Sequence, residues 1–411
     1  MNKEYLEKLA RLVVQGGVNL KEGQDVVINA DIQAAPLVRE VVKAAYDAGA
    51  RDCTVRYSDE IVAHEKWIRS SEEVLTDVPA WQAALLNDSA ENGAAYIHIL
   101  SDNPDLMKDV DPAKQAAAHK AMNQAAHIYR SRLDQGKNPW TIAAAASPEW
   151  AKKVYPELEE EQAVEQLWSD IFSVSRIDDN DPLENWARHD QSFAERVKKL
   201  NEAGFVQLHY KNSAGTDLYV DLPENYIFEG GSSETADGRR NFCNIPTEEI
   251  FSAPRRDGVN GKLVSTMPLS HSGKMIKDFW FEFKDGKVVD YDAAEGRDVI
   301  TELLASDEGA SRLGEVALVP WGSPIQKINR IFYNTLFDEN ASCHFALGKA
   351  YAECIPDGQN MSVEELKEKG LNHSIIHVDF MVGSEDLSIT GLTADGKEIP
   401  VFVNGIFSDQ F

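Results

Sequence analysis

A histidine and an aspartate in the C-terminal part of the chain, His377 and Asp379, are spaced so that they could bind one metal ion. They lie in residues 374–382, a run of β-branched and aromatic side chains that predicts a strand. Residues two apart on a strand share a face, so both would point one way while Val378 and Phe380 fill the other face. Because burying such groups unpaired costs free energy, they either hydrogen-bond each other or bind a metal. We favour the metal.

A second histidine, His344, follows an acidic segment that contains Glu339. From His344 onward the sequence predicts a helix, on which His344, Gly348 and Tyr351 would share one face at spacings of i, i+4 and i+7. Gly348 would leave room there for a metal ion or substrate. A lone histidine on a helix is more often structural, but the nearby carboxylate and the tyrosine on the same face favour a functional site.

Two further glutamates are weaker candidates when each is taken alone. Glu249 lies in the segment NIPTEEIF, and Glu315 directly precedes the apolar strand predicted at residues 316–319, where a solvated charge has little reason to lie. Glu248, beside Glu249, could serve as an anchor or a general base, but a solvated surface charge explains it at least as well.

Acids and histidines of this kind suit a metal-dependent hydrolase, because metal ions both activate water and stabilise the charge that develops on a cleaved amide. The zincin motif HExxH is missing, since His64-Glu65 has Ile68 at the fifth position. The GxSxG elbow of serine hydrolases is also missing, as are the phosphate-binding patterns GxGxxG and GxxxxGK[ST].

The elements that must position these residues fall into two regions. In the first, strands at residues 25–30, 53–57 and 95–100 alternate with helices at 34–50 and 59–71, which predicts an α/β domain with a mostly parallel sheet. More helices are expected at residues 113–132, 164–174 and 193–203.

Beyond an acidic turn near residue 180 the pattern becomes antiparallel. Residues 206–210 and 217–221 alternate, and residues 279–283 and 287–291 flank Asp285-Gly286 as in a hairpin. We therefore expect two domains: residues 1–180, an α/β domain that shields the site, and residues 181–411, an α+β domain rich in antiparallel strands that carries it.

The composition of the chain limits which partners and which cellular compartment we expect. The formal net charge of −27 over 411 residues argues against nucleic acid as a partner. The longest apolar stretches fall short of the roughly 20 residues of a transmembrane helix, and the amphipathic N-terminal residues do not predict a signal peptide. Four scattered cysteines indicate reduced thiols, so we expect a cytoplasmic protein without a membrane partner.

The segments that hold these candidates resemble those of the aminopeptidase T/aminopeptidase S family of metallopeptidases. The matching segments are NIPTEEIF, GEVALV, FDENASCHFALGKAY and HVDFMVG. Their order and spacing follow the family pattern, with intervals of 66, 24, 5 and 7 residues between Glu249, Glu315, Glu339, His344 and Tyr351.

The resemblance implies a ligand set for two divalent ions, in which Glu315 is the bridging carboxylate. The implied ligands are Glu249, Glu315, Glu339, His344, His377 and Asp379. Tyr351 would be the catalytic tyrosine that donates to the oxyanion. Cobalt, zinc and magnesium are associated with the family, and this ligand chemistry suits Zn²⁺, Co²⁺ or Mn²⁺ alike. Peptides with a free N-terminus would be the substrates, and cytoplasmic homodimers the assembly.

Two alternatives stay open at this point. The same ligands could serve another binuclear metal hydrolase, such as an amidase or a phosphoesterase. They could also belong to a protein that binds metal or peptide without catalysis, although that alternative leaves Tyr351 on the ligand face unexplained.

Overall fold

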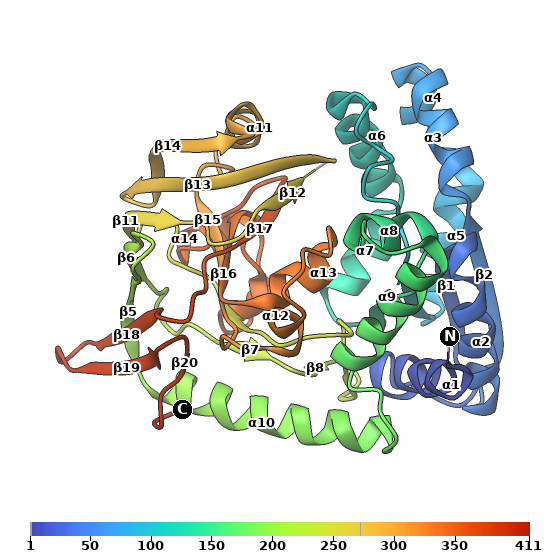
Figure 1. Ribbon diagram of the computed structural model, residues 1–411, viewed down its shortest axis with the longest axis horizontal. Coiled ribbons are helices and arrows are strands. Elements are labelled where there is room, and N and C mark those ends of the chain that lie inside the picture. The colour runs from blue at the N-terminus through green and yellow to red at the C-terminus, as the bar shows by residue number, and fades with distance from the viewer. Residues whose placement is uncertain (1, 272) are drawn as a thin grey trace. The chain divides into compact units, whose positions relative to one another are not determined.

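The computed structural model describes residues 2–271 and 273–411. The chain forms two compact units (Figure 1): unit 1 comprises Met1–Arg188 and Ser232–Pro246, and unit 2 comprises His189–Gly231 and Thr247–Phe411. The first passage between units follows Arg188, beyond the boundary expected near residue 180. The return of Ser232–Pro246 to unit 1 was not anticipated from the sequence.

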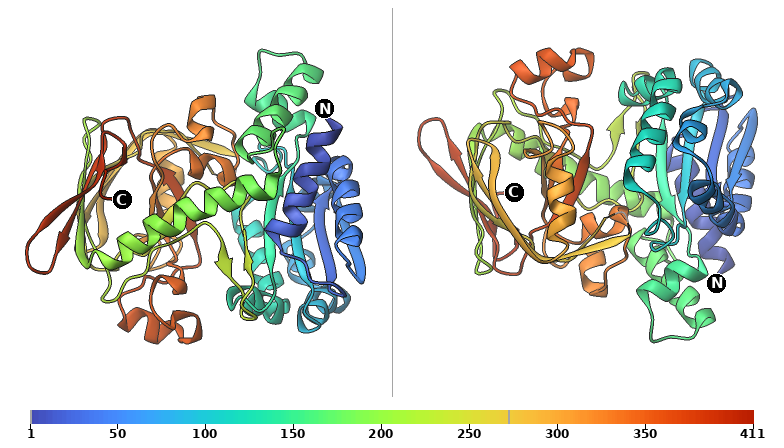
Figure 2. Two further views of the ribbon diagram at one scale, coloured as in Figure 1. Left: turned by 90° about the horizontal axis from the view of Figure 1, so that it is seen from below. Right: turned by 90° about the horizontal axis from the view of Figure 1, so that it is seen from above.

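Unit 1 is built on a four-stranded sheet whose order is β2-β1-β3-β4 and whose pairings are all parallel. Its strands are β1 (Asp25–Asp31), β2 (Asp52–Ser58), β3 (Ala95–Leu100) and β4 (Trp140–Ala144). Helices cover both faces of this sheet (Figure 2). The predicted parallel α/β architecture is confirmed, and β4 is an addition that the sequence pattern did not reveal.

The helices predicted in unit 1 are confirmed with shifts at their ends, but those at Glu72–Thr76, Ala80–Glu91 and Pro148–Val154 were not predicted. The helices of unit 1 are α1 (Lys3–Arg11), α2 (Ala35–Asp47), α3 (Glu60–Arg69), α4 (Glu72–Thr76), α5 (Ala80–Glu91), α6 (Pro112–Ala125), α7 (His127–Asp134), α8 (Pro148–Val154) and α9 (Glu160–Val174). The single helix expected at residues 113–132 is divided at Ala126 into α6 and α7. Helix α10 (Pro182–Glu202) carries the chain from unit 1 into unit 2.

Several of these helices begin where the sequence supplies a cap. The carboxylate of Asp111 accepts a hydrogen bond from the Ala113 N–H at the start of α6, and the Ser147 hydroxyl accepts one from the Trp150 N–H at the start of α8. Proline follows each cap, at a position where the missing N–H costs nothing.

The described residues of unit 2 form two antiparallel sheets. The larger has the order β12-β13-β11-β6-β5-β18-β19-β20, with β14 paired to β13. Its strands are β5 (Phe205–Lys211), β6 (Asp217–Asp221), β11 (Val259–Val264), β12 (Leu269–His271), β13 (Lys274–Lys284), β14 (Lys287–Glu295), β18 (Ser388–Thr393), β19 (Glu398–Val403) and β20 (Ile406–Phe407). The hairpin expected around Asp285-Gly286 is confirmed as β13 and β14.

The smaller sheet has the order β17-β16-β15-β10-β7. Its strands are β7 (Glu229–Gly230), β10 (Ile250–Ser252), β15 (Leu313–Leu318), β16 (His344–Gly348) and β17 (His377–Met381). One face contributes Phe345 and Phe380 to the core of unit 2, where Phe380 packs 5.3 Å from Phe281 of β13 between ring centroids. The other face holds the candidate site.

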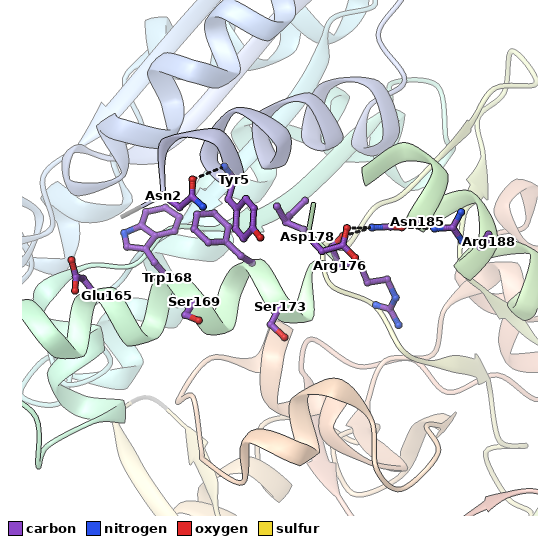
Figure 3. A pocket seen from close by; sticks show the side chains of 12 residues that line it. Asn2, Tyr5, Glu165, Trp168, Ser169, Ser173, Arg176, Asp178, Asn185 and Arg188 are labelled. Carbon is purple, nitrogen blue, oxygen red and sulfur yellow. Dashed lines mark hydrogen bonds between the residues drawn. The ribbon is translucent and has the colours of Figure 1, made fainter. Parts of the chain in front are cut away.

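A cavity of about 720 Å³ lies in unit 1 (Figure 3). Helices α1, α9 and α10 line it together with Arg176 and Asp178, and Tyr5 and Trp168 form its aromatic wall. Every predicted site residue lies instead in unit 2. Among the described residues, no helix is both long and apolar enough to cross a membrane.

Candidate metal centre

The register of the smaller sheet brings the predicted ligands onto one face. Glu315 of β15 pairs with Ala346 of β16, which in turn pairs with Asp379 of β17. Residues that pair across strands point to the same face, so the two carboxylates flank the small side chain of Ala346. The pairing of Gly348 with His377 places that imidazole on the same face.

The remaining histidine and one more glutamate follow the same alternation. His344 lies two residues before Ala346 and pairs with Ala317, so it points to the face of Glu315. Phe251 of β10 also pairs with Ala317, and Glu249 lies two residues before it. Because Ala317 and Ala346 are small, the acids and imidazoles around them have room to converge.

The resulting distances define two groups that share Glu315. His344 Nε2 lies 3.0 Å from a Glu249 oxygen and 3.8 Å from a Glu315 oxygen. His377 Nε2 lies 3.0 Å from the other Glu315 oxygen and 3.2 Å from Asp379. Within each group the possible ligand atoms lie within 4.8 Å of one another, a separation that one metal ion can span.

Backbone carbonyls orient both imidazoles. His344 Nδ1 lies 3.3 Å from the Ser342 carbonyl oxygen, and His377 Nδ1 lies 2.7 Å from that of Lys349. If each Nδ1 carries the proton and donates it, the lone pair of Nε2 faces the carboxylates, as a metal ligand requires. These carbonyl partners were not predicted, because main-chain contacts between distant segments leave no signal in a sequence.

The ionisable groups of the site change one another's pKa. Burial alone would raise the pKa of Glu315, but hydrogen bonds with His344 and His377 outweigh it and lower that pKa to about 2. Burial raises the pKa of Glu249, whose single imidazole partner compensates only in part. Burial would lower the pKa of both histidines, yet the surrounding carboxylates raise it well above the ordinary value. The site therefore favours bound positive charge.

Glu339 lies beside these two groups rather than within either. It opens a 3₁₀ turn, Glu339–Ala341, directly after helix α13 (Thr335–Asp338). With Asp379 it lines a small cavity of about 10 Å³. Burial raises its pKa well above the usual value, and the charges of Glu249 and Asp379 raise it further, so it belongs to the same electrostatic cluster.

The helix predicted from His344 onward is wrong, because His344–Gly348 forms β16. Alanine and leucine favour a helix locally, but the segment is buried between β15 and β17, and this tertiary context overrides the propensity. Gly348 does not leave room for a ligand either. It has a φ of +106°, and a Cβ there would come 2.1 Å from the Ile376 carbonyl oxygen.

Tyr351 nevertheless lies at the site, by a different route from the predicted one. Its ring centroid is 4.8 Å from that of His377 and 5.8 Å from that of Phe251. Partial burial raises the pKa of its hydroxyl well above the usual value, and Glu315 and Asp379 raise it further. The hydroxyl therefore stays protonated and can donate a hydrogen bond at neutral pH.

Sequence reasoning missed one buried amide next to the acids. Asn340 is fully buried, and its Oδ1 accepts a hydrogen bond of 2.6 Å from the Glu248 N–H. The available signal was its place directly after Glu339 in the segment FDENASCHF. Glu248 itself is 8% exposed, which excludes the solvated surface charge considered above.

Comparison with known proteins gives full-length matches. A family model described as thermophilic metalloprotease (M29) matches residues 2–407. Aminopeptidase AmpS of Bacillus subtilis is 46% identical over 402 residues, and aminopeptidase T of Thermus aquaticus is 40% identical over 402 residues. Each alignment covers 98% of this chain and 98% of the relative.

Solved structures agree with the sequence matches. Wild-type AmpT from Thermus thermophilus superposes with a TM-score of 0.92 at 38% identity, covering 98% of this chain and 99% of that chain. A 2,5-dihydroxypyridine dioxygenase from Pseudomonas putida shares the fold alone, with a TM-score of 0.53 at 12% identity. The resemblance seen in the sequence is thus confirmed, and the chain belongs to the M29 family of metalloproteases.

Proposed function

We propose that this metalloprotease is an aminopeptidase that releases N-terminal amino acids from peptides and uses two divalent metal ions bound in unit 2. The relatives AmpS and aminopeptidase T are named as aminopeptidases and align over nearly their whole length. The geometry adds the observation that carries the proposal: Glu315 lies between two imidazoles that belong to two different ligand groups.

The residues fit a pair of cations better than they fit a solvent-filled cluster. Glu249 and Glu315 are 9% and 4% exposed, and with Asp379 they bring three carboxylates to one face beside only two imidazoles. Buried carboxylates in such excess repel one another unless positive charge is bound between them. One ion would be held by Glu249, Glu315 and His344, and the other by Glu315, His377 and Asp379, with Glu339 completing the set.

Divalent ions at this site would supply Lewis acidity, which lowers the pKa of a water and polarises the scissile carbonyl. Zn²⁺, Co²⁺ and Mn²⁺ suit the mixed oxygen and nitrogen ligands, and Mg²⁺ is a further candidate.

The side chains of the chain supply the other requirements of the reaction. Tyr351 keeps its proton because its pKa is raised, so its hydroxyl can donate a hydrogen bond to the oxyanion that forms at the scissile carbonyl. Its ring lies against His377, which ties the donor to one ligand group. Lys349 and Ser342 fix the imidazoles through their carbonyls, so the ligand geometry does not have to form when substrate arrives.

The cellular compartment and the assembly state are also part of the proposal. We expect the enzyme to act in the cytoplasm as a homodimer, with the N-terminal residues 1–180 shielding the site, as the family resemblance implies. The four cysteines are free thiols, which fits a reducing compartment.

A metal titration with paired substrates tests the proposal. Chelator-treated protein should lose its activity and regain it as about two equivalents of Co²⁺ or Zn²⁺ are added. A leucyl peptide with a free amine should be cleaved, and its N-acetylated form should not. Cleavage of the acetylated peptide would indicate a different binuclear hydrolase, and tight metal binding without turnover would indicate a binding protein.

A further inference from the structure

The acids of the metal centre come from segments that lie far apart in the sequence. Glu249 and Glu339 are separated by 90 positions (339 − 249), and neither is fixed by pairing within a regular strand. Glu249 directly precedes β10, and Glu339 opens a 3₁₀ turn. Something other than strand register must therefore hold these two carboxylates near each other.

Asn340 connects the two segments through one side-chain amide. Its Oδ1 accepts the Glu248 N–H at 2.6 Å, one residue before Glu249. Its Nδ2 donates to the Leu336 carbonyl at 3.0 Å and lies 3.5 Å from a Glu339 carboxylate oxygen, at the long end of the hydrogen-bond range.

The chemistry of an amide matches all three of these partners. The Glu248 N–H needs an acceptor, whereas the Leu336 carbonyl and the Glu339 carboxylate need donors, and an asparagine side chain offers both. The contacts also determine the orientation of the amide, since a flipped group would point its NH₂ at the Glu248 N–H. Because the side chain is fully buried, water is not available to replace a lost partner.

We propose that Asn340 is a positioning residue of the metal centre, whose amide sets the separation between the Glu249 segment and Glu339. This inference rests on the proposed function. Asn340 acts through the two carboxylates and is not itself proposed to touch substrate or reacting atoms. Removing the Asn340 amide should leave the positions of the two carboxylates less fixed and weaken metal binding. The smaller sheet should keep its fold, because strand pairing holds it.

Unit 1 provides a matched control. Asn138 is also fully buried, and its Nδ2 donates to the carbonyls of Ala90 and Ala94 while its Oδ1 accepts from Arg132. It thus has the same burial and the same pattern of two donations and one acceptance, away from the metal centre. A substitution there lowers stability without touching a proposed ligand.

The experiment compares Asn340→Ser, Asn340→Asp and Asn138→Ser by Co²⁺ titration, visible spectrum, steady-state kinetics and melting temperature. Both Asn340 variants should bind Co²⁺ about 10- to 100-fold more weakly, the usual cost of losing a contact that orients a ligand. Their cobalt absorption should shift, and kcat at saturating Co²⁺ should fall while KM for the peptide changes little. Asn138→Ser should lower only the melting temperature.

Asn340→Asp keeps the shape and the acceptor, so it separates positioning from simple packing. If it binds Co²⁺ as the wild type does, with the same spectrum and kcat, the positioning role is wrong. The role is also wrong if both Asn340 variants differ from the wild type only in melting temperature, as the control does. Failure of the proposed function looks different: the wild-type protein itself would then lack metal-dependent peptidase activity.

Discussion

Each unit has a partly buried histidine on an apolar strand, yet these two histidines have opposite properties. His98 lies on β3 of unit 1, where burial, reinforced by the charges of Arg130 and Arg56, lowers its pKa to about 4. His377 lies on β17 of unit 2, where burial acts in the same direction but Asp379 and Glu315 reverse it. The comparison shows that neighbouring charge, and not burial, decides whether such a histidine is suited to a site for cations.

The local sequences already contain this difference. His98 is followed two positions later by Leu100, and His377 is followed two positions later by Asp379. On a strand, that position shares the face of the histidine. The neutral His98 has a structural partner, the Tyr129 hydroxyl at 3.3 Å from its Nε2.

The largest expected effect comes from removing the carboxylate that both ligand groups share. Glu315→Gln should lower activity by about a thousandfold or more, because several kcal/mol of charge stabilisation are lost, and metal content should fall with it. Elemental analysis of the purified protein, combined with peptide turnover, measures both. His98→Gln serves as the matched change in unit 1 and should keep its metal and its activity. A fully metallated Glu315→Gln protein would remove Glu315 from the ligand set.

The same residues show how much of the site the sequence alone predicts. Alternation along β17 correctly placed His377 and Asp379 on one face, because strand periodicity is a local property. Glu249 and Glu339 were weak candidates on their own and were selected mainly by the family resemblance, since the contacts that bring them to the site depend on segments far away in the chain. The helix expected at His344 failed for the same reason: neighbouring strands, which the local pattern does not contain, determine β16.

The parallel sheet of unit 1 was more accessible to prediction. Its strands β1 and β3 are short buried runs with helices between them, which local patterns report directly. The return of Ser232–Pro246 to unit 1 was not accessible, because pairings such as that of Ile142 with Asn244 join residues about a hundred positions apart.

A smaller loss of activity is expected when the proposed oxyanion donor alone is removed. Tyr351→Phe should keep its metal content and lose roughly 100- to 1,000-fold in kcat, as expected for one preorganised donor. The ring contact with His377 does not need the hydroxyl, so the ligand group should stay intact. Metal analysis and steady-state kinetics on an aminoacyl-p-nitroanilide check both points. Normal turnover would exclude the donor role.

Acid should affect the stability of unit 1 through His98. Its folded pKa of about 4 lies below the unfolded value near 6.5, so the unfolded state binds more protons between these pH values. The contribution of His98 to the free energy of unfolding is therefore fully present above about pH 6.5. It is lost as the pH drops toward 4, by on the order of 3 kcal/mol in total. Urea unfolding at pH 7.5 and pH 5 should show more than half of this loss, and His98→Gln should reduce it. An equal loss in the variant would assign the acid sensitivity to other groups.

The smallest expected effect comes from giving β3 of unit 1 the spacing of His377 and Asp379 on β17 of unit 2. Leu100→Asp places a carboxylate two residues after His98, on the same strand face, as Asp379 stands to His377. An opposite charge at that distance should raise the pKa of His98 by about one unit, which an NMR titration of its imidazole measures. Zn²⁺ should still not bind there, because Arg56 and Arg130 remain close and the change adds a single carboxylate. Tight Zn²⁺ binding by this variant would mean that the His-x-Asp spacing alone makes a metal site. An unshifted pKa would mean that the nearby arginines, rather than the missing acid, control His98.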